Sequence, residues 1–153
     1  MTALFVRAEP ALGLNVRFTL VPDPDALAAL RRMLRRWLSE VGADADESAA
    51  IVLAANEAWQ NAIEHGHGFQ PVPVSVRFTR EDDAVVVTVR DAGGRGLPAG
   101  DPDRGRGIEL MKGLVGDVRL DLGSRRGGVA ALRHKIRAPA PLSPASGSGT
   151  HAA

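Results

Sequence analysis

Two neighbouring stretches of the chain alternate apolar and polar residues with a period of two. They are VPVSVRF at 72–78 and AVVVTVRD at 84–91, and the charged turn TREDD joins them. Such alternation is typical of strands that bury one face, so the sequence predicts two strands linked by a turn. Any fold for this chain must therefore contain a sheet.

The segment before these strands predicts one more strand and then a helix. Residues 14–21 alternate as a strand. Asp23 is placed to cap the helix that follows, Pro24 suits its first turn, and Gly42 ends it. Apolar residues recur along it at three- and four-residue steps, namely Leu27, Leu30, Leu34, Trp37 and Leu38.

A second helix is expected to start near Asp44 or Asp46 and to run to the glycines at 66 and 68. After the two central strands come a Gly-rich loop, a short helix and a closing hairpin, at 91–107, 108–116, 117–122 and 128–136. The strands come in pairs with helices grouped between them. This order predicts an α+β fold, a two-layer α/β sandwich with a mixed, mostly antiparallel sheet and helices on one face.

Length and composition limit the class of protein. The chain has 153 residues, enough for one domain with one core, and a formal net charge of +1, which does not suit a general polyanion binder. No stretch approaches the roughly 20 apolar residues of a membrane span, and cysteine is absent, which fits the cytoplasm. We expect an N-terminal segment at 1–13, a folded domain at 14–137 and a disordered Pro/Ser/Gly-rich tail at 138–153.

The stretch NEAWQNAIEHG at 56–66 carries polar side chains along a helix that is otherwise largely apolar. Glu57, Asn61 and His65 follow at four-residue steps, about 6 Å of rise each, and so share one stripe. An amide oxygen suits Mg²⁺, and a carboxylate one turn away could accept a proton during attack on a phosphate. A partly exposed helix with incidental polar residues explains the stripe as well. A metal pair of His65 and His67 is the weaker idea because no third ligand lies nearby.

The strand at 84–91 runs directly into a second polar pattern, Asp91 followed by Gly93, Gly94 and Gly96. A carboxylate at a strand end can accept a hydrogen bond from the exocyclic amino group of adenine. Glycines after it let a planar base approach the backbone. An Asp-Gly turn is commonplace, so this pattern is weak by itself.

The third pattern is DRGRGIELMKGL, in which Gly105 and Gly107 are expected immediately before a helix. Free N–H groups at a helix start suit phosphate oxygens, and Arg104 and Arg106 add positive charge. Two glycines can equally form a plain hinge. The sequence contains neither a P-loop nor a G-x-G-x-x-G between strand and helix, so neither common nucleotide fold applies.

In this order, E-x-x-x-N, D-x-G-x-x-G and G-x-G resemble the N, G1 and G2 boxes of the GHKL (Bergerat-fold) ATPases. The segments NEAWQNAIEHG, VTVRDAGG and GRGIELMKGLVGDVRL are most similar to the bacterial anti-sigma factor serine-protein kinases. The resemblance covers about residues 14–136. It implies that Glu57 is the general base for a substrate serine and that Asn61 coordinates Mg²⁺. It also implies an ATP site made of Asn61, His65, Asp91, Gly93, Gly96, Arg104, Gly105, Arg106 and Gly107, beneath a lid at 97–104.

The resemblance further implies a regulatory kinase that binds Mg-ATP, sequesters a sigma factor and phosphorylates a serine of an anti-sigma factor antagonist. A homodimer without direct nucleic-acid binding is expected. Two departures bear on activity. The stretch 96–105 is shorter than the lid of the best-known members, and Gly128 stands where the family has threonine. They leave an alternative open, an ATP-dependent binding module of the same fold without phosphotransfer.

Overall fold

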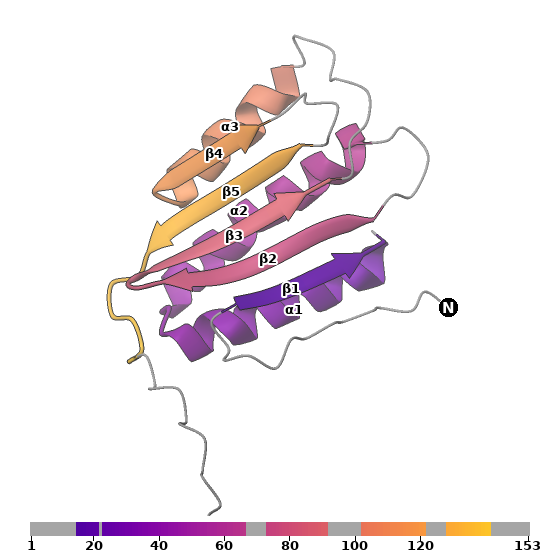
Figure 1. The fold of residues 1–153 in the computed structure, drawn as a ribbon. Helices are drawn as coiled ribbons and strands as arrows, with labels where there is room; N and C mark the ends of the chain where they lie inside the picture. The colour runs from indigo at the N-terminus through magenta and orange to yellow at the C-terminus, as the bar shows by residue number, and fades with distance from the viewer. Residues whose placement is uncertain (1–14, 22, 67–72, 92–101, 122–127, 142–153) are drawn as a thin grey trace, which may run out of the picture.

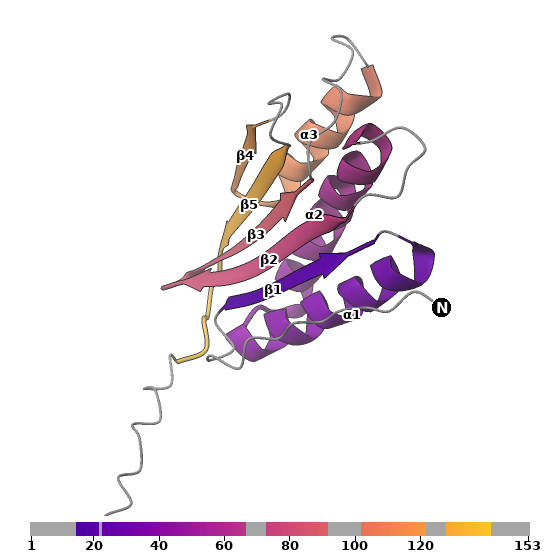
Figure 2. The ribbon, with the colours of Figure 1, turned by 45° about the vertical axis from the view of Figure 1, so that its right-hand side comes forward.

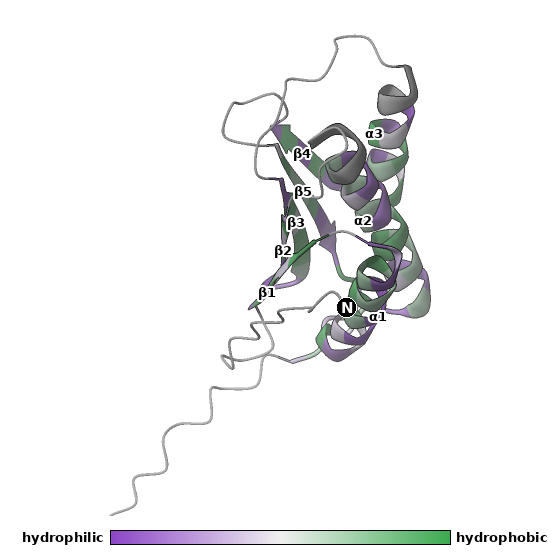
Figure 3. Ribbon diagram, turned by 90° about the vertical axis from the view of Figure 1, so that its right-hand side faces the viewer, coloured by the Kyte–Doolittle hydropathy of each residue, from purple (hydrophilic) through white to green (hydrophobic). Residues whose placement is uncertain are grey.

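The computed structural model describes residues 15–21, 23–66, 73–91, 102–121 and 128–141. Within this part of the chain a five-stranded sheet forms one layer and three helices form the other (Figure 1). Turned views show that the three helices lie on the same face of the sheet, and no helix of the described residues lies on its other face (Figures 2 and 3). The predicted two-layer α/β sandwich of the α+β class is confirmed.

The elements follow one another as the sequence predicts. In chain order they are β1 (Asn15–Leu20), α1 (Pro24–Val41), α2 (Ala45–Gly66), β2 (Val74–Glu81), β3 (Ala84–Arg90), α3 (Pro102–Leu114), β4 (Asp117–Asp121) and β5 (Val129–Lys135).

The strands lie in the order β1-β2-β3-β5-β4, and each neighbouring pair is antiparallel. The expectation of a mostly antiparallel sheet is confirmed, and no parallel pair occurs between the strands that the structure describes. The reason is the last hairpin. Its second strand, β5, returns beside β3, so β4 becomes the outer strand beyond it.

Apolar residues on the inner face of the sheet pack against the helices. Phe78 in β2 lies at the centre, with its ring centroid 5.3 Å from that of Phe18 and 5.6 Å from that of Trp37. The largest fully buried side chains are Trp59, Phe78, Leu30, Leu34, Leu38, Ile51, Met111, Leu132, Ile136, Val76, Val85 and Val87. In α2, Val52 is buried in this core, whereas Leu53 is 46% exposed.

The ends of α1 are fixed by the residues predicted for them. Asp23 Oδ1 accepts a hydrogen bond from Ala26 N at 2.6 Å, and Gly42 ends the helix in the left-handed conformation with φ 96°. Gly42 also has no room for a Cβ atom, because the backbone at Ala140 packs directly on it. Ala140 N donates to Val41 O at 2.9 Å, so the packed chain continues past the predicted domain end at 137.

Helix α3 corrects one prediction. It begins at Pro102, where the sequence predicted a loop continuing to Gly107, so Gly105 and Gly107 lie inside the helix and not before it. A proline is tolerated at the first helical position because the missing N–H has no helical partner there. Each interior glycine costs about 1 kcal/mol of helix propensity. Packing overrides that cost, since Gly107 and Met111 are both buried.

Candidate functional site

The three predicted polar patterns converge on one end of the molecule. Figure 1 shows the end of β3, the start of β5, the second half of α2 and the first turns of α3 at the same end of the sandwich. This end brings together residues that are far apart in the sequence.

Glu57 and Asn61 lie on the side of α2 that faces α3. A Cβ atom built on Gly107 would lie 3.3 Å from Glu57 Oε2 and 3.6 Å from Asn61 Nδ2. Both side chains are half-buried, and Gly107 is buried. The polar stripe of α2 therefore contacts the backbone of α3 at the one residue type that lets a helix approach so closely.

These groups could serve a magnesium nucleotide. A carboxylate and an amide oxygen, one helical turn apart, supply hard oxygen donors, and Mg²⁺ typically takes one or two protein ligands beside waters and phosphate oxygens. No group of three or more His, Cys, Asp or Glu that could hold a metal ion occurs among the described residues. The donor set would fit an ion carried mainly by its phosphates, with Asn61 as its protein ligand and the Glu57 carboxylate one turn away as a possible proton acceptor.

Asp91 follows directly after β3 and is tied to Gly128 just before β5. Asp91 N donates to Gly128 O at 3.0 Å, and Gly128 N donates back to Asp91 Oδ1 at 2.8 Å. The pair extends the ladder that joins Arg90 to Val129. One carboxylate oxygen of Asp91 is thus oriented by a backbone N–H. The predicted loss of a hydroxyl at position 128 leaves this contact intact.

The other predicted site residues are placed only in part. Arg104 and Gly105 lie in the first turns of α3, and Arg106 is exposed on it. His65 belongs to the last turn of α2, and the orientation of its side chain falls outside the described residues. Two glycines, a histidine and most of the lid also fall outside them, namely Gly93, Gly96, His67 and residues 97–101.

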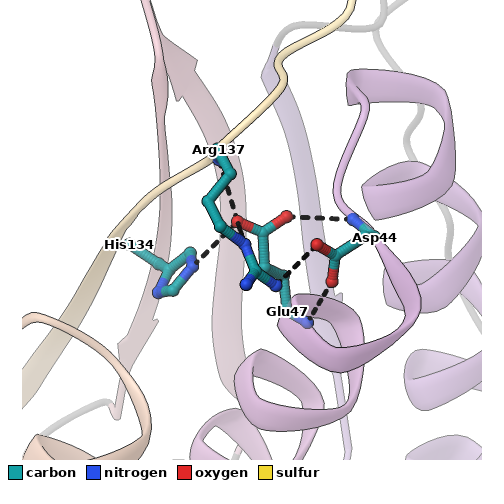
Figure 4. A network of polar contacts seen from close by, with 4 residues as sticks. All are labelled: Asp44, Glu47, His134 and Arg137. Atoms are coloured by element: carbon teal, nitrogen blue, oxygen red, sulfur yellow. Dashed lines mark hydrogen bonds and ion pairs between the residues drawn. The ribbon is translucent and has the colours of Figure 1, made fainter.

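A buried carboxylate at the other end of α2 was missed by the sequence analysis. Glu47 is 4% exposed, and with Asp44 it forms a capping box: Glu47 N donates to Asp44 Oδ1, and Asp44 N donates to Glu47 Oε2, each at 2.9 Å. Figure 4 shows how Arg137 and His134 complete this network. Arg137 N donates to Glu47 Oε1 at 2.9 Å, and His134 Nε2 lies 3.5 Å from the same oxygen.

The network lowers the pKa values of both carboxyl groups. Burial alone would raise the pKa of Glu47, but hydrogen bonds from the backbone N–H groups of Asp44 and Arg137 outweigh it and lower that pKa. The pKa of Asp44 is lowered chiefly by the N–H of Glu47, and the charge of Arg137 adds to this. The start of α2 is thereby anchored to the chain that leaves β5.

Two hollows in the described surface lie away from the Glu57 and Asn61 pair. One, of about 320 Å³, borders the Glu47 network, and the other, of about 650 Å³, lies between α1 and α2 and includes Arg31, Val52 and Leu53 in its lining. Both are shallow, and neither includes Asp91, Gly107 or Gly128 in its lining. No helix within the described residues is long and apolar enough to cross a membrane.

Comparison with known proteins decides the family. Residues 20–133 match the histidine kinase-like ATPase domain. The chain belongs to that family. The resemblance to the GHKL ATPases, based on the sequence motifs, is thus confirmed.

One solved structure narrows the comparison. The chain is similar to the crystal structure of the RsbU and RsbW domains of Rv1364c from Mycobacterium tuberculosis, with a TM-score of 0.63 and 30% sequence identity. The similarity covers 85% of this chain and 34% of the other, so this chain spans about a third of that protein's length. A match to a chain that carries an RsbW domain agrees with the anti-sigma factor kinase branch of the family.

Proposed function

We propose that this histidine kinase-like ATPase domain is an anti-sigma factor that binds Mg-ATP and phosphorylates a serine of an antagonist protein. It would hold its sigma factor until the antagonist displaces it. The observation that carries the proposal is the approach of Glu57 and Asn61 to the backbone of Gly107, where a Cβ atom would lie 3.3 Å from Glu57 Oε2. A domain that only bound nucleotide would have no need of a proton acceptor at that position.

The proposed transfer step assigns one role to each group. The serine Oγ attacks the γ-phosphorus, its proton passes to the Glu57 carboxylate, and the bond to the β,γ-bridging oxygen breaks to release ADP. Asn61 Oδ1 would hold Mg²⁺, which would supply positive charge to neutralise the phosphates. Asp91 accepts a hydrogen bond from the adenine amino group, and the N–H of Gly128 keeps one of its carboxylate oxygens in place.

Nucleotide binding is tested first, without a partner protein. Calorimetric titration of ATP with Mg²⁺ should show micromolar binding by the wild type and a loss of at least about tenfold in Asp91→Asn. Replacing one carboxylate oxygen by NH₂ puts a donor against the adenine donor and leaves a polar group unpaired, which costs about 1–3 kcal/mol. Equal affinity in both proteins would remove Asp91 from the site.

Phosphotransfer is tested separately with a purified anti-sigma factor antagonist and γ-labelled ATP. Glu57→Ala should abolish labelling of the antagonist while ATP affinity stays within a few-fold of the wild type, because the carboxylate acts on the attacking hydroxyl. Undiminished labelling would exclude Glu57 as the base. Tight ATP binding by a wild type that labels no antagonist would favour the alternative, a binding module of the same fold without transfer.

A further inference from the structure

The face of the sheet that no helix covers carries three arginines close together. The register places Arg17 of β1 directly across from Arg77 of β2, and Arg90 of β3 directly across from Ser75. Arg77 and Ser75 are two residues apart on one strand, so Arg90 is a diagonal neighbour of Arg77, about 7–8 Å away. Alternation along the strands points all three away from the core, and Arg17 and Arg90 are exposed.

These three differ from the other cations of the same face. Arg119 lies 3.5 Å from Asp117, Arg133 lies 3.5 Å from Glu81, and Lys135 lies 3.1 Å from Asp83. Arg17, Arg77 and Arg90 have no ion pair or hydrogen bond with any other residue that the structure describes. The sheet thus has a balanced half at β4 and β5 and an unbalanced positive half at β1, β2 and β3.

No described residue compensates for this arrangement with an ion pair or a hydrogen bond. Like charges directly across an antiparallel pair destabilise it by a fraction of a kcal/mol. Across the sheet from Arg90, the register leads through Val129 to an acidic residue, Asp121, which is two strands away at about 10 Å. Thr19, Ser75 and Thr88 beside the three arginines are small and polar, and Val129 lies directly across from Arg90. Small side chains beside the arginines leave room for a partner's side chains to reach the guanidinium groups.

We propose that Arg17, Arg77 and Arg90 form a docking surface for an acidic segment of a partner protein. Charge complementarity selects the partner, because three guanidinium groups within one patch, none of them paired with a described residue, offer forked donors to the carboxylates of Asp and Glu side chains. The surface lies on the face of the sheet opposite α2, the helix that carries Glu57 and Asn61 (Figure 2). The inference goes beyond the proposed kinase function and does not depend on nucleotide binding.

An acidic protein segment fits this face better than a nucleic acid does. Single strands are held by aromatic side chains on which the bases stack, and the described strands have no aromatic residue among their outward positions on this face. A duplex needs a wide basic surface, whereas here Glu81, Asp117 and Asp121 share the sheet. The positive patch is confined to three arginines, which is the size expected of a surface that binds a few carboxylates.

The test measures binding of a short fluorescein-labelled peptide of alternating glutamate and serine by fluorescence anisotropy, at low salt. Arg17→Gln/Arg77→Gln/Arg90→Gln should bind about tenfold more weakly than the wild type, since each of the three charged contacts contributes about 0.2–1 kcal/mol. The control Arg32→Gln/Arg36→Gln/Arg119→Gln removes the same net charge from other exposed positions and should stay within twofold. Melting curves of both variants confirm folding.

Three results would overturn the proposal. They are equal weakening in the control variant, no binding of the peptide to the wild type, and tighter binding of single-stranded DNA that is also lost in the triple variant. Saturating Mg-ATP should leave peptide binding unaltered. A failure of the nucleotide site and a failure of this surface therefore give different results.

Discussion

Gly107 is the position where a small change should separate stability from activity. Replacing it by alanine places a Cβ atom 3.3 Å from Glu57 Oε2 and 3.6 Å from Asn61 Nδ2. The first distance is shorter than ordinary van der Waals contact, so the Glu57 carboxylate must move by a few tenths of an ångström. Gly113 lies in the same helix with nothing within 4 Å of its Cβ position, which makes Gly113→Ala a matched control.

The expected magnitudes follow from these contacts. Alanine in place of an interior glycine favours the helix by up to about 1 kcal/mol, so Gly113→Ala should be as stable as the wild type or more so. In Gly107→Ala the strained Glu57 side chain offsets this gain by about 0.5–1.5 kcal/mol, leaving stability near the wild type. If a misplacement of 1 Å costs about a hundredfold in rate, a shift of about 0.3–0.5 Å costs roughly four- to tenfold.

Urea unfolding gives the two free energies of unfolding, and single-turnover labelling of the antagonist gives the rate. We expect Gly107→Ala to lose rate without losing stability and Gly113→Ala to lose neither. If the two variants transfer phosphate equally fast, the close approach of α3 does not hold Glu57 in place. A large loss of stability in Gly107→Ala alone would show that the carboxylate cannot move, and the rate argument would then fail.

Three further changes test other parts of the structure. Asn61→Ala should weaken the dependence of ATP affinity on Mg²⁺, and an unchanged metal titration would count against Asn61 as a ligand. Glu47→Gln should lower the free energy of unfolding at neutral pH by about 1.5–3 kcal/mol through lost charged hydrogen bonds. Because the folded pKa of Glu47 is lowered from its usual 4.5, the stability it contributes is present above that pH and is lost as the pH falls below it. Unfolding curves should therefore show a shallower acid loss in the variant, and parallel curves would contradict this. Ending the chain after residue 141 should leave the melting temperature unchanged, whereas ending it after 137 removes the bond from Ala140 N to Val41 O and should lower it.

The parts of the fold that the sequence predicted are those set by neighbouring residues. Asp23 and Gly42 bound α1 because a cap and a left-handed glycine act within one turn. The hairpin of β2 and β3 was predicted because alternation and a charged turn lie in one short stretch. The stripe of Glu57 and Asn61 was predicted because residues four apart share one face of a helix.

The rest depends on contacts between distant residues. The Gly128 N–H reaches the carboxylate of Asp91 across 37 positions, and only the register of β5 on β3 brings them together. Arg137 reaches Glu47 across 90 positions. The capping box itself has the readable spacing of Asp44 and Glu47, three residues apart, and could have been found. The early start of α3 could not, because glycine disfavours a helix and only its packing reverses that preference.

The two ends of α2 are held by different means, and this bears on how the site works. At the start of α2, the Glu47 carboxylate accepts hydrogen bonds from the backbone N–H groups of Asp44 and Arg137. These charged hydrogen bonds attach this end of the helix to the chain after β5. Its second half meets α3 at Gly107, which has no side chain to interlock with Glu57 or Asn61. The Glu57 carboxylate is therefore carried on α2, whose start is fixed by hydrogen bonds. Among the described residues, its position beside α3 depends on van der Waals contact with Gly107. An added methyl group at 107 changes that contact and no hydrogen bond, which is why its effect should appear in the rate before it appears in the stability.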